Sequence, residues 1–326
     1  MRENDVRATY RFLGHKDETE IRVINPFRPG DVQSIFVYSE DAFVNVCRKF
    51  EGQYNVYVGI NERHRGGTKT ETVKNIDAIV FDIDPVRTKG LPSTQSELRE
   101  AEKVGLAVCE YLKGSGKKPY LALSGNGYQV WLKVDIQPLD AEHNKKIEGV
   151  LKDIQRHMAR TYGNERVKID NIGDLARVIK VIGTKSVKAM TTDERPNRFS
   201  KWIEIPTEIK PHITWSMKIL ILAKTYQPAV IEQISEPEGR MSPTAILKLI
   251  ASMSPKEQMV FRGIWKTDKW SFPSRSEAEY YFIYKLKLKG LSADDAWKVM
   301  DASKLSKWHT AKPAYRQTTI SKAYRG

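Results

Sequence analysis

The chain of 326 residues contains little cysteine and no long apolar run, and each absence excludes a class of protein. Its two cysteines, Cys47 and Cys109, lie far apart and without histidines at zinc-ligand spacing. A disulfide framework is therefore excluded, and we expect no structural zinc. No apolar run reaches about 18 residues and no signal peptide is recognisable, so we expect a soluble, cytoplasmic protein with no membrane partner.

Acidic residues are fewer than basic ones, with 40 Asp and Glu against 54 Lys and Arg, a formal charge of +14. Residues 240–326 contain 17 Lys and Arg against 7 Asp and Glu, so about +10 of this charge lies in the last quarter. This pattern predicts a polyanionic partner, nucleic acid first, although a solvated basic surface would have the same composition. With 40% hydrophobic residues the chain can build a substantial core.

The order of predicted elements indicates a mixed α/β (α+β) fold. Residues 20–60 predict an N-terminal α/β unit, in which Ser39 caps a helix. A regular series of strands and helices then follows at 76–84, 94–113, 120–124, 128–134, 140–162 and 177–182. This βαββαβ order is the split unit of a four-stranded antiparallel sheet with both helices on one face. The other face is expected to be open for a site.

Proline and glycine mark a boundary late in the chain. Pro228, Pro237, Gly239 and Pro243 stand in a polar context, which is typical of a linker. We therefore expect a first domain over 1–225, a linker over 226–242 and a small all-α domain over 243–326.

An apolar run, Ile-Asp-Ala-Ile-Val-Phe-Asp-Ile-Asp at 76–84, ends in two carboxylates. The i, i+2 spacing places Asp82 and Asp84 on one face of a strand, with Ile79, Phe81 and Ile83 facing the other way. Adjacent carboxylates repel unless a cation lies between them, and Mg²⁺ or Mn²⁺ takes such hard oxygen ligands. The strand predicts a metal-dependent phosphoryl-transfer site, although Asp-x-Asp is also common in loops and caps. A haloacid-dehalogenase phosphatase has a similar strand, but Pro85-Val86 stands where that family has Gly-Thr or Gly-Val.

Two further segments carry residues suited to phosphate chemistry. The glycines of Ser124-Gly125-Asn126-Gly127 let a phosphate approach the backbone, although an ordinary Asn-Gly hairpin turn has the same sequence. Residues 167–188 offer a third carboxylate, Asp170, followed by cations that could hold a triphosphate. A solvated basic strand is the alternative for that segment.

Read together, these segments resemble the archaeo-eukaryotic primase superfamily, in the primase-polymerase branch of plasmids and phages. Asp82 and Asp84 match its Asp-x-Asp strand, and residues 124–129 match its Ser-Gly-x-Gly-Tyr-His turn, except that Gln129 replaces the histidine. The remaining matches are Asp170, Ala176, Arg177, Gly183, Thr184 and Lys188, then Arg195-Pro196 with Arg198-Phe199-Ser200, and upstream Asn61 with Arg63.

The resemblance implies a primase core with an RRM-like sheet and an N-terminal α/β unit, followed by a helix-bundle domain. It implies template-directed primer synthesis and extension from nucleoside triphosphates on single-stranded DNA, with two divalent ions, Mg²⁺ or Mn²⁺. Asp82, Asp84 and Asp170 would hold the ions. The implied nucleotide-binding residues are Ser124, Gly125, Asn126, Gly127, Gln129, Arg177, Lys180, Thr184 and Lys188, of which Arg177 could instead be structural.

Template contacts are expected in two places. Arg63 and Arg65 belong to a basic, glycine-containing loop, while Lys307, Trp308 and Tyr315 belong to the basic tail, which would bind single-stranded template or a replicative helicase. Burial of these aromatics in the core is the alternative. A second functional hypothesis is a replication-initiation or single-strand-binding protein with a vestigial site, which retention of all three aspartates argues against.

Overall fold

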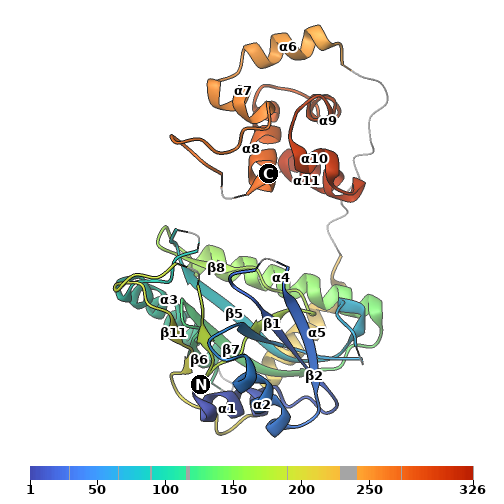
Figure 1. The fold of residues 1–326 in the computed structure, drawn as a ribbon. Helices are drawn as coiled ribbons and strands as arrows, with labels where there is room; N and C mark the ends of the chain where they lie inside the picture. Colours follow the sequence, from blue (N-terminus) through green and yellow to red (C-terminus); the bar gives the residue numbers. More distant parts are fainter. Residues whose placement is uncertain are drawn as a thin grey trace. The chain divides into compact units, whose positions relative to one another are not determined.

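The computed structural model describes residues 1–28, 30–64, 66–88, 90–114, 118–188, 190–227, 241–272 and 274–325. The chain divides into two compact units, Met1–Pro228 and Ala229–Gly326, each with its own hydrophobic core (Figure 1). Most of the linker predicted at 226–242 lies outside the described residues, as does Arg65.

The first unit begins with a four-stranded sheet that has two helices packed on it. Its elements are α1 (Glu3–Leu13), β1 (Thr19–Ile24), β2 (Val32–Val37), α2 (Glu40–Phe50) and β3 (Asn55–Gly59), in the sheet order β2-β1-β3-β9. Ser39 caps α2 as predicted, because its side chain accepts a hydrogen bond from Ala42 N. Helix α1 was not predicted, although Val6, Phe12 and Leu13 are buried on its inner face.

The split βαββαβ unit follows. Its elements are β5 (Val73–Pro85), α3 (Gln95–Lys113), β6 (Tyr120–Leu123), β7 (Tyr128–Ile136), α4 (Ala141–Tyr162) and β8 (Val167–Asp170). The strands lie in the order β8-β5-β7-β6, and every neighbouring pair is antiparallel. Thr94 forms the capping box with Glu97 that begins α3. The predicted mixed α/β architecture is therefore confirmed.

The last strand of this unit was predicted at the wrong place. Residues Val167–Asp170 pair with β5, whereas Val178–Lys180 form β9 and pair with β3 in the N-terminal sheet. Val167 and Ile169 alternate with exposed Lys168 and supply the apolar face that α3 and α4 cover. The apolar run at 178–182 joins the N-terminal core instead.

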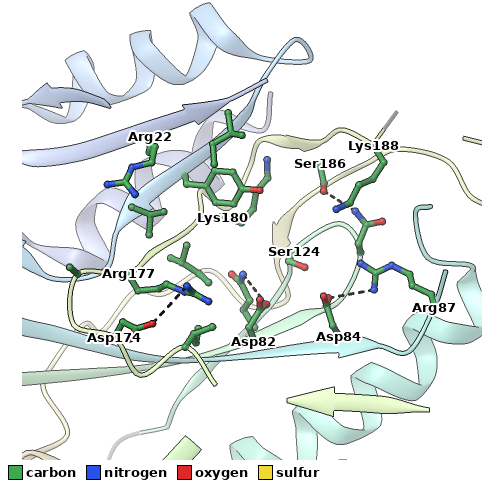
Figure 2. A pocket seen from close by; sticks show the side chains of 18 residues that line it. Arg22, Asp82, Asp84, Arg87, Ser124, Asp174, Arg177, Lys180, Ser186 and Lys188 are labelled. Atoms are coloured by element: carbon green, nitrogen blue, oxygen red, sulfur yellow. Dashed lines mark hydrogen bonds and ion pairs between the residues drawn. The ribbon is translucent and has the colours of Figure 1, made fainter. Parts of the chain in front are cut away.

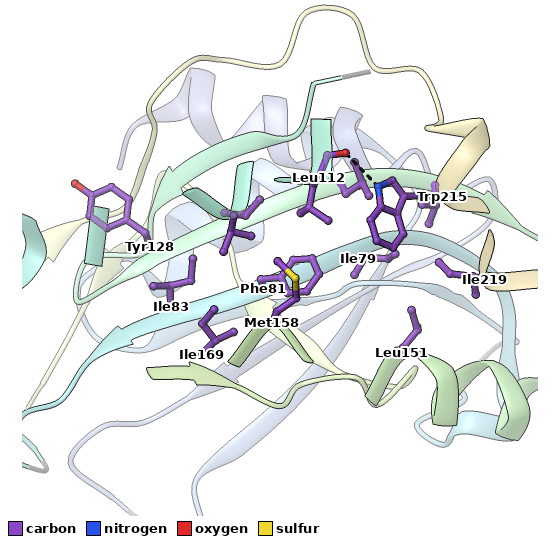
Figure 3. Close-up of a cluster of buried hydrophobic side chains, with 14 of the residues drawn as sticks. Ile79, Phe81, Ile83, Leu112, Tyr128, Leu151, Met158, Ile169, Trp215 and Ile219 are labelled. Carbon is purple, nitrogen blue, oxygen red and sulfur yellow. Dashed lines mark hydrogen bonds between the residues drawn. The ribbon is translucent and has the colours of Figure 1, made fainter. Parts of the chain in front are cut away.

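Both helices of the split unit cover one face of its sheet, and α5 (Ile213–Thr225) joins them (Figure 3). Ile79, Phe81 and Ile83 point into this core from β5, as the sequence pattern predicted. Trp215 on α5 packs into the same core, and its Nε1 donates to Leu112 O at 3.1 Å. The carboxylates of β5 therefore face the opposite side of the sheet.

That opposite face is only partly open, which corrects the expectation of a free face. The ring of Trp131 on β7 lies 5.6 Å from that of Phe12 on α1 and 5.3 Å from that of Trp202, between ring centroids. Helix α1 and the segment around Trp202 thus cover the sheet on this side and leave the end of β5 free. The remaining short elements are β4 (Glu62–Arg63), η1 (Thr70–Thr72), β10 (Lys185–Ser186), β11 (Arg198–Phe199) and β12 (Lys201–Trp202).

The second unit is helical in its described residues. Its helices are α6 (Pro243–Ala251), α7 (Pro255–Phe261), α8 (Arg275–Leu288), α9 (Ala293–Asp301), α10 (Ser306–Thr310) and α11 (Pro313–Arg325). Ser274 caps α8 and Ser292 caps α9, and the side chain of each accepts a hydrogen bond from the backbone N–H three residues later. Phe282, Trp297 and Trp308 are fully buried at its centre. In the described parts of both units, no helix is long and apolar enough to span a membrane.

Candidate active site

A cavity of about 520 Å³ opens beside the end of β5, where the two sheets of the first unit meet (Figure 2). Residues 82 and 84 of β5 lie on one side of it, and residues 176–180, which lead into and form β9, lie on another. Its charged lining residues are Arg22, Asp82, Asp84, Arg87, Asp174, Arg177, Lys180 and Lys188.

Asp82 lies in a row of polar residues that crosses three strands. Gln129 on β7 and Asp170 on β8 are its partners in the antiparallel registers on either side. Directly opposed residues project to the same face of a sheet, so all three side chains emerge beside one another. Gln129 Nε2 donates to Asp82 Oδ1 at 3.3 Å.

The carboxylates of this row are electrostatically unfavourable without a cation. Burial, reinforced by the charges of Asp84 and Asp170, raises the pKa of Asp82 to about 7. Burial also raises the pKa of Asp84, against the opposing effect of the Arg87 guanidinium, whose Nη1 lies 3.6 Å from Asp84 Oδ1. Removal from water and proximity of like charges both penalise the ionised forms. Added positive charge would therefore be stabilised here.

The donor atoms of the row fit a hard divalent cation. Asp82 and Asp84 offer carboxylate oxygens, and Gln129 Oε1 is buried without a hydrogen-bond partner. Oxygen ligands of this kind suit Mg²⁺ or Mn²⁺. Asp170 is less free, because Lys168 Nζ lies 2.8 Å from its Oδ1. Among the described residues, no three His, Cys, Asp or Glu side chains are already gathered as a metal site.

The turn between β6 and β7 presses against the carboxylates. A Cβ atom on Gly127 would lie 2.4 Å from both Asp84 Oδ1 and Ile83 O, so only glycine permits this approach. Gly125 has a φ of +103°, which also favours glycine. Ser124 N donates to Gly127 O at 2.9 Å and closes the turn.

Asn126 fastens this turn to its surroundings rather than leaving it exposed. Its Oδ1 accepts from Ser93 N at 3.1 Å, and its Nδ2 donates to Ser186 Oγ at 2.9 Å. Asn126 and Ser186 are buried, yet both line the cavity. The turn is therefore tied to the segments on both sides, and Asn126 has a supporting role in the positioning of the backbone.

Several cations face the carboxylates across the cavity (Figure 2). Lys188 forms no ion pair with any described residue, and burial lowers the pKa of its ammonium. The Arg87 guanidinium donates hydrogen bonds to Leu91 O and Pro85 O, which fix its position. The Arg177 guanidinium is 43% exposed and lies 3.8 Å from Asp174 Oδ2. Cations placed around a pair of metal-binding carboxylates suit the phosphates of a nucleotide.

Two predicted nucleotide contacts are occupied within the protein. Lys180 lines the cavity, but its Nζ donates to Lys185 O at 2.7 Å and burial lowers the pKa of its ammonium to about 7. Thr184 is fully buried, and its Oγ1 donates to Val181 O at 2.8 Å. Thr184 therefore holds the turn after β9 and does not reach the cavity, which corrects that expectation.

Arg63 is a supporting residue and not a template contact. It is buried, it pairs with Glu20 Oε2, and its Nη2 donates to Ala176 O at 2.9 Å. Asn61 acts in the same way, since its Nδ2 donates to Leu175 O at 2.9 Å. The Asn-x-Arg pair thus fixes the backbone that carries Arg177 into the cavity.

The closing Arg-Pro-x-Arg-x-Ser segment also supports the site from outside. Arg195 donates to both carboxylate oxygens of Glu97, at 2.7 and 2.8 Å, and so ties the segment to the start of α3. Ser200 Oγ accepts from Gly183 N at 2.9 Å. Neither Arg195 nor Ser200 lines the cavity.

The aromatic residues predicted to stack on template bases in the tail are engaged within the second unit. Trp308 is fully buried, its Nε1 donates to Asp301 Oδ1 at 2.7 Å, and it cannot receive a base. Tyr315 donates its hydroxyl to buried Glu279 at 2.7 Å. Lys307 contacts Ser276 Oγ and lies 4.7 Å from the Tyr315 ring centroid. The prediction for Trp308 is wrong, because the helices close over it.

Four charged or aromatic cavity residues were missed by sequence reasoning: Arg22, Tyr57, Arg87 and Asp174. Arg87 could have been suspected, since it follows Asp84 by three residues. Arg22 and Tyr57 belong to the N-terminal sheet, and only the pairing of β3 with β9 brings them to the site. No local pattern in the sequence identifies them.

No family model matches the sequence, and a search of curated proteins finds no match. Among solved structures, the chain is similar to the primase RepB′, with 16% identity and a TM-score of 0.43 over 99% of this chain and 94% of that one. It is similar to the catalytic domain of the same primase, solved in complex with initiator DNA, with 14% identity and a TM-score of 0.41 over 69% and 94%.

The chain is also similar to the archaeo-eukaryotic primase domain of the cyanophage S-2L primase-polymerase, with 12% identity and a TM-score of 0.39 over 66% of this chain and 96% of that one. These proteins are of the kind that the sequence motifs resemble. Because the TM-scores lie below 0.5, the assignment of a function rests on the residues of the site.

Proposed function

We propose that the protein is a primase-polymerase, which synthesises and extends primers from nucleoside triphosphates on single-stranded DNA. One observation carries the proposal: Asp82 and Asp84 face a cavity of about 520 Å³ whose other sides carry Arg87, Arg177 and Lys188. Buried carboxylates that favour a cation, with Lys and Arg side chains around the same cavity, fit a metal-bound triphosphate. The ordered sequence motifs that resemble primases support the same assignment.

The residues of the cavity divide the work of nucleotide addition. Asp82 and Asp84 hold divalent ions, with Asp170 as the third carboxylate after its release from Lys168. The ions, when bound, lower the pKa of the primer hydroxyl and neutralise charge on the leaving pyrophosphate. Gln129 keeps Asp82 oriented through its Nε2 donor.

The phosphates would be bound by cations and backbone groups that line the cavity. Lys188 and Arg177 offer cationic donors, and the backbone at 124–127 lies beside Asp84, with Ser124 and Asn126 lining the cavity. Positioning of the phosphates is the main contribution that a protein makes to phosphoryl transfer. Lys180 is a weaker candidate, since one of the N–H donors of its Nζ is already used by Lys185 O and the side chain is buried.

Incubation with circular single-stranded DNA, labelled nucleotides and Mg²⁺ or Mn²⁺, with and without an annealed primer, tests the proposal. Primed templates should be extended, and unprimed templates should yield short labelled products. Asp82→Asn and Asp84→Asn should reduce both activities by at least about a hundredfold, because a metal ligand is removed. Asp135→Asn, an exposed carboxylate on β7, is the matched control. Synthesis that survives in both site variants would overturn the assignment.

A second candidate is a replication-initiation or single-strand-binding protein with a vestigial site. Two features favour it: the described residues contain no preassembled group of three metal-binding side chains, and Gln129 replaces the histidine of the motif. This candidate predicts tight binding of single strands with no product under any metal condition, which the same incubation would reveal.

A further inference from the structure

The segment between α7 and α8 contains a short hairpin that we call the aromatic hairpin, residues 264–272 (Figure 1). Backbone hydrogen bonds join its two arms, from Phe272 N to Trp265 O at 3.0 Å and from Thr267 N to Trp270 O at 2.7 Å. Paired positions share a face, so the three aromatic side chains emerge on the same side.

Trp270, Phe272 and Tyr281 form a continuous row of half-buried rings, and half-buried Trp265 lies on the facing arm of the hairpin. The ring centroids of Trp270 and Phe272 lie 5.6 Å apart, and that of Tyr281 on α8 lies 5.0 Å from Phe272. Trp265 and Trp270 pack against the helical core but retain exposed area. This contrasts with Trp297 and Trp308, which are enclosed.

Cations surround this surface without matching carboxylates. Lys256 Nζ lies 4.7 Å from the ring centroid of Phe272 and 5.1 Å from that of Trp270. Lys266 Nζ lies 4.5 Å from the centroid of Trp265, and the Arg275 guanidinium lies 5.9 Å from it. In the described part of the chain, no ion pair or hydrogen bond engages the charged groups of these three cations.

Exposed aromatic rings beside uncompensated cations match the chemistry of one ligand class. Unpaired bases stack on aromatic rings, while the phosphates between them bind Lys and Arg. A duplex keeps its bases stacked internally and could use only the cations. An acidic peptide would likewise use the cations and gain little from the tryptophans.

We propose that the aromatic hairpin binds single-stranded nucleic acid, with bases on Trp265 and Trp270 and phosphates on Lys256, Lys266 and Arg275. It takes the place of Trp308, which the sequence suggested for stacking. The proposal rests on the proposed primase function only for the identity of the strand as a template. Binding itself requires no nucleotide addition, so the two proposals can fail separately.

The first test measures binding of a labelled oligothymidylate to the full chain by fluorescence anisotropy, in EDTA and over a range of salt. Lys266→Gln with Lys269→Gln removes two exposed charges from the hairpin, and Lys312→Gln with Lys322→Gln removes two exposed charges elsewhere in the same unit. We expect the double variant in the hairpin to bind about tenfold more weakly. The slope of its log affinity against log salt concentration should become shallower by about 0.7 for each phosphate that is no longer neutralised. The control pair should change affinity less than about twofold. If both double variants weaken binding equally, net charge and not the hairpin determines the affinity, which contradicts the proposal.

The second test locates the bases. An oligonucleotide containing iodouracil should photocrosslink to Trp265 or Trp270, and sequencing of the crosslinked peptide identifies the residue. Trp270→Leu should weaken binding several-fold without lowering the salt dependence of the affinity. Thermal unfolding of this variant reports whether it folds. Crosslinks confined to other peptides, or displacement of the oligonucleotide by an acidic peptide, would overturn the proposal. If the hairpin binds no DNA but primers are still synthesised, the hairpin proposal fails and the proposed primase function stands. If the hairpin crosslinks to DNA but no primer is made, the primase function fails and the hairpin proposal stands.

Discussion

Gln129 and Asp82 lie directly opposite each other on β7 and β5, and Gln129 Nε2 donates to Asp82 Oδ1 at 3.3 Å. The other amide atom, Oε1, is buried without a partner. Glutamine thus stands where related motifs carry histidine, and it contacts a predicted metal ligand without adding charge. In the proposed mechanism its contribution would therefore be orientation and hydrogen bonding.

Gln129→Ala should raise the KM for nucleotides several-fold more than it weakens template binding, because the amide that it removes lies at the nucleotide site. Gln129→His should retain activity or increase it, because a protonated imidazole adds a cation near the phosphates, and its activity should fall as the imidazole loses its proton. Steady-state kinetics over a pH series measure both effects. Gln137→Ala, at an exposed position just beyond β7, is the control. Unchanged kinetics in both Gln129 variants would place this side chain outside the site.

Divalent ions should stabilise the wild-type fold at pH 8. Mn²⁺ or Mg²⁺ that binds the native carboxylates and not the unfolded chain raises the unfolding temperature by mass action. The increase should largely disappear in Asp84→Asn and should persist in Asp135→Asn. Differential scanning fluorimetry with and without EDTA measures this independently of activity. An equal increase in both variants would show that the ions bind elsewhere.

The stability of the metal-free protein should decline as pH rises from about 4 to about 7. The pKa of Asp82 is raised to about 7 in the fold, so the native state keeps a proton there that the unfolded chain releases near pH 4. The stabilisation is complete below the unfolded pKa and is lost as pH rises through the folded pKa. Asp82→Asn should reduce this decline, leaving the part that the raised pKa of Asp84 contributes, and should gain about 1–3 kcal/mol at pH 8, roughly 2–10 °C in Tm. Urea unfolding at several pH values would decide, since a parallel decline in the variant contradicts the prediction.

Lys180 should act in the adjacent pH range with the opposite sign. The pKa of its ammonium is lowered to about 7, so stability is gained as pH rises from about 7 towards the unfolded value and is lost as pH falls through 7. Together with Asp82, this predicts a minimum of metal-free stability near pH 7. Lys180→Met should flatten the alkaline limb, although it also removes the hydrogen bond to Lys185 O. Lys201→Met, at an exposed position, should leave the limb unchanged.

Truncation after Gly239 should reduce primer initiation far more than primer extension. Initiation must gather two nucleotides on a template without a duplex, whereas extension starts from a duplex already bound at the catalytic unit. Removal of the basic second unit takes away phosphate-binding groups, so residual template binding should show a shallower salt dependence. Product analysis on primed and unprimed circles measures the difference. If the truncated protein initiates as well as the full chain, helicase docking becomes the better explanation for the second unit.

The fold was largely predictable because its periodic patterns are strong. The strand at 76–84 and the capped helices α3 and α4 were located from apolar spacing and capping residues alone. The prediction of the last strand was wrong because Val167–Asp170 has only four residues, while the nearby run at 178–182 is longer and more apolar. Local pattern could not reveal that this run pairs with β3 instead.

The site was predictable only as far as residue type and order indicate chemistry. Asp82, Asp84 and the turn at 124–127 adjoin one another, and Lys188 faces them across the cavity. Arg63 and Trp308 were misjudged because their burial depends on Glu20 and Asp301, with which they pair only in the folded chain. The sequence alone does not distinguish an exposed side chain from a buried one of the same residue type.

The row Gln129–Asp82–Asp170 is drawn from three strands, and Gln129 alone is 47 residues from Asp82 along the chain. Local hairpin formation brings β6 and β7 together early, but β8 can join the row only after α4 has been synthesised and has crossed the sheet. Lys188 lies further along still. A complete site therefore needs almost two hundred residues to have emerged from the ribosome, and a nascent chain stalled before β8 carries Asp82 and Asp84 but lacks the third carboxylate, Asp170.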